Sequence, residues 1–168
     1  TYITQTADGV LSGEQALSTL ATGYVKNTTG TGVLSVQATP IPVSDGGANN
    51  KASFGITIDG GGSAVTSGVK GFITVPFNCT INGWDILADQ SGSVVVDVWK
   101  DTYTNFPPTV ADTIAGREKA TLSSAQKTQD NSLSSWTTTV AEGDTIGFNV
   151  DSATTVTRVT VIVKVTKT

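Results

Sequence analysis

The run VTVIVKVT at residues 159–166 is the clearest strand signal in the chain. Valine occupies every second position of this run, and the positions between the valines hold Thr160, Ile162, Lys164 and Thr166. Successive side chains of a β-strand point to opposite faces of a sheet. The alternation therefore predicts a strand whose valine face packs against a hydrophobic core.

Shorter runs of the same kind precede this strand and are separated by turn residues. They predict strands over residues 53–58, 70–77, 80–88, 93–100, 136–140 and 144–150. Residues 123–130 fit either a single helical turn or a long loop. Seven or eight short strands at this spacing predict an all-β fold, an antiparallel β-sandwich that is jelly-roll-like.

The composition agrees with this fold class. The chain is rich in Thr and Val, which favour pleated surfaces, and its 18 glycines suit the turns between strands. Charged residues make up 14% of the chain, against about 25% in an average globular domain. Cys79 is the single cysteine, so no disulfide forms within the chain, and we expect it to be a small buried residue.

Charge and hydropathy exclude two classes of partner. The net charge is −4 and no basic patch occurs, so we expect no nucleic-acid partner. No apolar run approaches the roughly 18 residues that would cross a bilayer, so we expect no membrane insertion. No signal-peptide pattern is found, and loss of an initiator Met before Thr1 would make this a nearly complete gene product.

The first fifty residues differ from the rest of the chain. Residues 12–22 predict a short helix, capped by Ser12 and Gln15, and residues 39–51 resemble a linker. Two short strands are expected between them, near residues 24–26 and 33–36. We therefore predict an N-terminal arm over residues 1–50 and a β-sandwich domain over residues 51–168.

The arm has too few large apolar residues to form a core of its own. A helix of about ten residues is marginal in water unless its apolar stripe packs on another surface. The alternative is that the helix folds back on its own domain. We favour anchoring or oligomerisation, and the residues expected to carry it are Leu11, Ala16, Leu17, Leu20, Val33 and Leu34.

Several stretches resemble a module of tail-fibre, appendage and head-associated proteins of tailed bacteriophages. They are residues 57–63, 71–77, 96–101 with the pair Pro107-Pro108, 122–126 and 144–157. Residues 11–20 and 30–34 are similar to a short segment that precedes such modules. The resemblance implies a virion surface protein that is a homotrimer, with its arm anchored and its β-domain projecting outward. The short chain fits a capsid decoration or cement protein, or a short head fibre, better than a long fibre.

No catalytic constellation is found in the sequence. Without His there is no Ser-His-Asp or Cys-His pair and no His-based zinc site. Asp97 and Asp101 would lie roughly 13 Å apart on one strand, too far for a retaining glycosidase. Asp97 is instead expected to be a sheet-surface carboxylate or a partner of Lys100 or Arg158. We predict no enzyme activity, no cofactor and no metal, with a depolymerase as the third alternative.

Sugar binding is the better functional alternative to a structural role. Sugars stack on exposed aromatic rings while nearby amides take their hydroxyl groups. The residues that could form such a platform are Trp99, Tyr103, Asn105 and Phe106. The alternative, which we favour, is that Trp99 belongs to the core and that the proline pair stiffens a loop at a subunit contact. We expect Trp84 and Trp136 to be core residues.

Two functional hypotheses follow. The first is a non-catalytic structural component of the virion, made in the host cytoplasm and attached through its arm to the major capsid protein or another virion protein. The alternative is a tail-fibre receptor-binding tip that recognises a host surface glycan.

Overall fold

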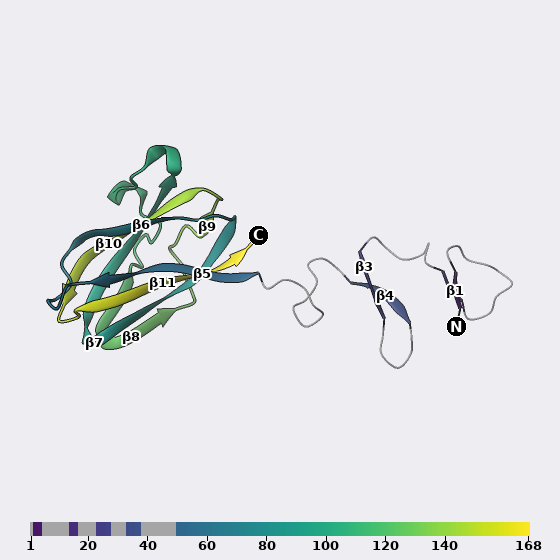
Figure 1. The fold of residues 1–168 in the computed structure, drawn as a ribbon, viewed down its shortest axis with the longest axis horizontal. Coiled ribbons are helices and arrows are strands. Elements are labelled where there is room, and N and C mark those ends of the chain that lie inside the picture. Colours follow the sequence, from purple (N-terminus) through teal and green to yellow (C-terminus); the bar gives the residue numbers. More distant parts are fainter. Residues whose placement is uncertain (1, 5–13, 17–22, 28–32, 38–49) are drawn as a thin grey trace. The chain divides into compact units, whose positions relative to one another are not determined.

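The computed structural model describes residues 2–4, 14–16, 23–27, 33–37 and 50–168. The chain divides into two units, Thr1–Asn49 and Asn50–Thr168. The second unit holds a sheet whose strands are shown in Figure 1. In chain order these are β5 (Lys51–Asp59), β6 (Gly68–Thr74), β7 (Cys79–Thr102), β8 (Ala120–Asp130), β9 (Thr139–Val140), β10 (Asp144–Thr154) and β11 (Arg158–Lys167). The all-β prediction is confirmed for this unit.

The sheet is antiparallel and curls on itself. The first part of β7 pairs with β11, and its second part pairs with β10. On its other side β7 pairs with β8 along both parts. Outside β11 and β10 lie β5 and β6. The strands therefore form two four-stranded halves, β5-β11-β7-β8 and β6-β10-β7-β8, and the unit is sandwich-like.

One long strand replaces the two that the sequence predicts over residues 80–88 and 93–100. The polar residues 89–92 between them resemble a turn in the sequence, but hydrogen bonds to backbone groups far along the chain keep this segment in the sheet. Asp89 accepts from the Arg158 amide at 3.0 Å, and the Gln90 side chain donates to the carbonyl of Thr155. At Gly92 a Cβ atom would lie 2.3 Å from the Thr155 hydroxyl, so only glycine fits this close approach.

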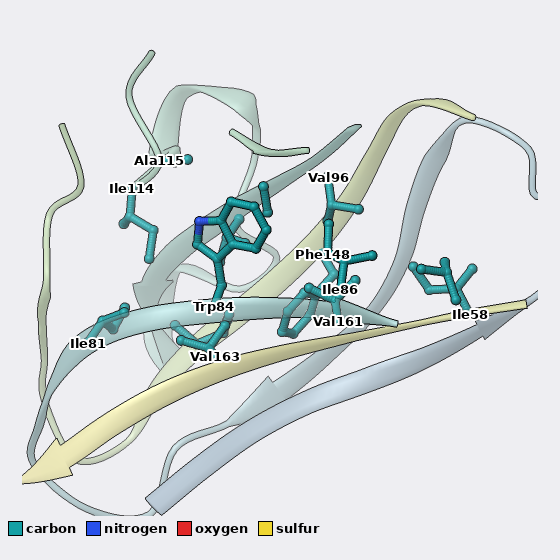
Figure 2. Close-up of a cluster of buried hydrophobic side chains, with 14 of the residues drawn as sticks. Ile58, Ile81, Trp84, Ile86, Val96, Ile114, Ala115, Phe148, Val161 and Val163 are labelled. Carbon is teal, nitrogen blue, oxygen red and sulfur yellow. The ribbon is translucent and has the colours of Figure 1, made fainter. Parts of the chain in front are cut away.

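The hydrophobic core lies between the two halves. Figure 2 shows buried side chains gathered there, among them Trp84 of β7, Phe148 of β10 and Val161 of β11. The alternation of β11 is confirmed, since Val159, Val161, Val163 and Val165 are all buried. Trp84, Trp136 and Cys79 are core residues as expected. This core holds the two halves together, because each half buries one face of its strands against the other half.

The prediction for residues 123–130 is wrong, because they belong to strand β8. Of the eleven residues of β8, only Ala120 and Leu122 are buried. The strand lies at an edge of the sheet, where β7 supplies its backbone partners along Trp84–Leu87 and Gly92–Val96. An edge strand with polar side chains lacks the apolar alternation from which strands are predicted.

The first unit is described only in short pieces. Strand β1 (Tyr2–Thr4) pairs in parallel with β2 (Glu14–Ala16), and β3 (Tyr24–Asn27) pairs antiparallel with β4 (Leu34–Gln37). The helix predicted over residues 12–22 is wrong at Glu14–Ala16, where the backbone bonds to another strand. The rest of that segment lies outside the described residues. Strand pairing there agrees with the marginal stability of so short a helix.

An aromatic pocket on the outer face of the sheet

Three strands bring six residues together on the face of the sheet that points away from the core. Val96, Val98, Ile146 and Phe148 point inward, so their neighbours in sequence point outward. The register places the outward residues in two rows, Phe72–Gly147–Trp99 and Thr74–Thr145–Asp101. Strand pairing, and not closeness in sequence, assembles this surface.

The segment between β7 and β8 folds back over these rows. It contains two short 3-10 turns, η3 (Tyr103–Asn105) and η4 (Val110–Asp112). The Phe106 ring meets the Phe72 ring edge-on, with centroids 4.9 Å apart. The Asn105 amide donates to Asp101 Oδ1 at 3.1 Å. These contacts hold the turn against the sheet.

Gly147 provides the space for this packing. A Cβ atom at this position would lie 3.2 Å from the Phe72 ring and 3.3 Å from Pro108. Both distances are tighter than ordinary van der Waals contact, so a side chain here would displace the ring or the proline. The glycine between two aromatic positions is therefore part of the site.

The residues proposed from the sequence as a sugar platform separate in the structure. Tyr103 is 72% exposed and Phe106 is 50% exposed, and Asn105 is exposed beside them. Trp99 is only 7% exposed and bridges to Thr113 beneath the folded-back segment. Trp99 is therefore buried, as the core alternative expected, but it lies beneath this segment and not in the core between the two halves. Phe72, 37% exposed, was missed, although its outward facing is visible in the alternation of its strand.

The exposed rings border a small cavity of about 210 Å³. It is lined by Phe72, Ile73, Thr74, Tyr103, Phe106 and Thr145, none of which is charged. Thr145 is 2% exposed, and its hydroxyl has no hydrogen-bond partner among the described residues. We refer to this cavity and its lining as the aromatic pocket.

A buried ion pair ties the folded-back segment to β7. Asp97 is 1% exposed, and its Oδ1 accepts from the Thr113 hydroxyl at 2.6 Å. In the part of the chain that the structure describes, no donor reaches its Oδ2 in hydrogen-bonding geometry, but the Lys119 ammonium lies 3.1 Å away. Lys119 also donates to Asp151 at 2.6 Å, and this hydrogen bond, followed by the ion pair with Asp97, raises the pKa of Lys119. Both predictions for Asp97, a sheet-surface carboxylate or a partner of Lys100 or Arg158, are wrong, because this segment covers Asp97 and supplies Lys119 as its partner.

Two further carboxylates order the same segment. Asp112 accepts from the Thr109 amide at 2.7 Å and from its hydroxyl, and these bonds lower the pKa of Asp112. Glu118 accepts from the Ser134 hydroxyl and from the amides of Ser134 and Ser135, and the hydroxyl bond is the main reason its pKa is lowered. The segment that carries Tyr103 and Phe106 is therefore fixed at several points.

Two larger cavities lie elsewhere on the described part of the second unit. One, of about 420 Å³, is lined by Asp85, Leu87, Lys127, Thr128 and Gln129. The other, of about 430 Å³, is lined by Lys51, Ala52, Asn82, Asn131, Lys164, Val165 and Thr166. An ion pair of 2.7 Å between Asp85 and Lys164 joins their linings. Both are larger than the aromatic pocket, but each contains charged residues and neither contains an aromatic ring.

Of the predicted anchoring residues, three are outside the described part of the chain, namely Leu11, Leu17 and Leu20. Ala16 ends strand β2, Val33 is 45% exposed, and Leu34 begins β4. Within the described ranges, no three His, Cys, Asp or Glu side chains lie close enough to hold a metal ion. The same ranges contain no helix of the length and hydropathy needed to cross a membrane.

Comparison with known proteins gives no relative: no family model, no curated protein and no solved structure matches this chain.

Proposed function

We propose that this chain is a non-catalytic bacteriophage virion surface protein whose β-sandwich domain recognises a host surface glycan. The observation that carries the proposal is the aromatic pocket, where Tyr103 and Phe106 are exposed beside uncharged hydroxyl groups. Aromatic faces cover the apolar face of a sugar, and hydroxyl groups fix its orientation. An exposed aromatic cluster of this kind is typical of a binding surface.

The virion assignment is supported by the sequence resemblance. The stretches that resemble phage fibre modules include parts of β6, β7, β8 and β10 and the proline pair beside the pocket. We further propose that the sandwich is a jelly roll, because the long antiparallel pair β7–β8 runs through both four-stranded halves. A homotrimer whose residues 1–50 attach to the virion completes the proposal.

Binding of the full chain to host cells and to their isolated surface polysaccharide tests the proposal. We expect binding that Tyr103→Ala and Phe106→Ala each abolish. Leu87→Ala is the matched control, since Leu87 is 47% exposed and lines a cavity on the other half of the sheet. Absence of binding to any host cell or polysaccharide, or equal loss in the control, would contradict it. Unchanged polysaccharide length after incubation separates binding from depolymerase activity.

A second candidate is capsid decoration through the arm. The observation that favours it is the exposed apolar surface of the first unit, where Tyr24 is 55% and Val25 is 56% exposed. Such side chains gain free energy when another protein covers them. The partner would be the major capsid protein or another virion protein. Deletion of residues 1–40 should abolish association with particles while the far-ultraviolet spectrum of the β-domain persists, and full association of the shortened chain would refute this role.

A further inference from the structure

The aromatic pocket has the size of one sugar ring. Its volume is about 210 Å³, whereas pockets that enclose a drug-sized ligand measure roughly 300–1,000 Å³. Phe72 and Phe106 form one aromatic wall, and Tyr103 borders the opening with 72% of its surface exposed. A single ring with an apolar face matches this lining, and an extended chain would continue over the exposed rings.

The charges around the pocket favour a neutral ligand. No lining residue is charged, and two acidic residues beside Thr145, its strand partner Asp101 and its sequence neighbour Asp144, already have partners. Asp101 accepts from Asn105 and from the Thr102 amide, and Asp144 pairs with Lys100 at 3.2 Å. The net charge of the chain is −4. A sugar with a carboxylate or phosphate would find no free cation in the pocket and a repelling field outside it.

Thr145 offers a polar partner at the floor of the pocket. Its side chain is buried, and its hydroxyl oxygen makes no hydrogen bond to any other described residue. Leaving a buried hydroxyl without a partner is unfavourable, so a valine of nearly the same shape would suit the folded state better. Polar groups that weaken the fold without compensation concentrate at functional sites. A ligand hydroxyl that enters between the rings would supply the missing partner.

We propose that the aromatic pocket binds one neutral pyranose ring, with its apolar face on Phe106 and Tyr103 and one hydroxyl on Thr145. This inference rests on the proposed glycan recognition and names its ligand class and a residue that determines specificity. The ring is bound and released unchanged, and no bond of the sugar is broken.

Saturation-transfer NMR of the full chain with methyl glycosides tests the inference. The neutral probes are the methyl glycosides of glucose, galactose, mannose and N-acetylglucosamine, and the acidic probes are those of glucuronic acid and N-acetylneuraminic acid. We expect binding of at least one neutral probe, and of no acidic probe. Thr145→Val should weaken that binding about 3- to 10-fold, the equivalent of one net hydrogen bond. Its melting temperature should stay equal or rise, which shows that the variant folds.

Thr128→Val is the matched control, because Thr128 lines the larger cavity on the other half of the sheet. It should leave binding of the neutral probe unchanged. Binding of an acidic probe, binding that Thr145→Val does not weaken, or no binding of any probe would overturn the inference. If the chain still binds host polysaccharide in that case, the proposed function stands without this subsite. If a neutral probe binds but no host cell or polysaccharide does, the subsite stands and the proposed function fails.

Discussion

Lys119→Met should lower the free energy of unfolding more than Asp97→Asn, although both changes break the ion pair between Lys119 and the buried Asp97. Lys119→Met leaves the Asp97 carboxylate, 1% exposed, with the Thr113 hydroxyl as its remaining partner. Asp97→Asn leaves a lysine that is about one third exposed and still pairs with Asp151 at 2.6 Å. The two variants break the same ion pair, but only the first leaves a buried charge without a compensating cation.

The expected magnitudes follow from this asymmetry. Breaking a buried pair so that one charge is stranded costs about 3–5 kcal/mol, and the remaining hydroxyl bond places Lys119→Met at the lower end, near 3 kcal/mol. Asp97→Asn keeps an acceptor for Thr113 and exchanges a charged hydrogen bond for a neutral one, a loss of about 1 kcal/mol. The double variant should cost little more than Asp97→Asn alone, because it strands no charge.

Equilibrium unfolding in urea at pH 7, followed by tryptophan fluorescence, measures these differences. All three tryptophans are at most 7% exposed, so their emission reports unfolding of the β-domain. Lys127→Met controls for the loss of one positive charge at an exposed position of β8. If the free energy of unfolding falls as much for Asp97→Asn as for Lys119→Met, or more, the unpaired Asp97 charge is not what destabilises the Lys119 variant.

Three other predictions concern acid, thiol chemistry and the glycine of the site. The Gly61 amide donates to Asp59 and the Thr157 hydroxyl donates to Asp89, and these hydrogen bonds lower the pKa of both carboxyls. The stability that the two carboxylates contribute is therefore complete above their ordinary pKa of 3.8 and is lost as pH falls through their lower pKa in the folded protein. Thermal melts should therefore show a falling melting temperature from about pH 5 to about pH 2, and a flat profile would contradict this. Burial, with a smaller effect of Asp144, raises the pKa of the Cys79 thiol, so a thiol reagent should react at the rate of unfolding and not at that of an exposed cysteine. Gly147→Leu should push Phe72 and Pro108 apart, cost about 1–3 kcal/mol in urea unfolding and abolish glycoside binding, whereas unchanged binding would exclude this packing role.

Local patterns predict the strands that are half buried and regular. The valine alternation of β11 and the paired apolar positions around Trp84 are visible in the sequence because one face of each strand meets the core. The polar edge strand β8 is not visible, since its order comes from backbone bonds to β7. The continuity of β7 depends on hydrogen bonds that Asp89 accepts and Gln90 donates, each with a residue more than sixty positions away in the sequence. Such long-range hydrogen bonds override the turn propensity of a polar segment.

The site is less predictable than the fold for a related reason. Tyr103 and Phe106 could be proposed from the sequence because they lie in an aromatic loop that no folding rule requires. Phe72 and Thr145 could not, because strand register alone brings them beside that loop. The burial of Trp99 and Asp97 likewise depends on how the segment between β7 and β8 folds back. That segment contains no periodic pattern of apolar residues from which its path could be predicted.

The most direct test of the account is where a host glycan touches the chain. Amide chemical shifts of the isotope-labelled full chain, recorded with an oligosaccharide released from host surface polysaccharide, give that position. We predict the largest shifts at Ile73, Thr74, Tyr103, Phe106 and Thr145, which line the aromatic pocket. Shifts confined to Leu87 and to Lys127, Thr128 and Gln129 on the other half of the sheet, or no shifts with any such oligosaccharide, would contradict it.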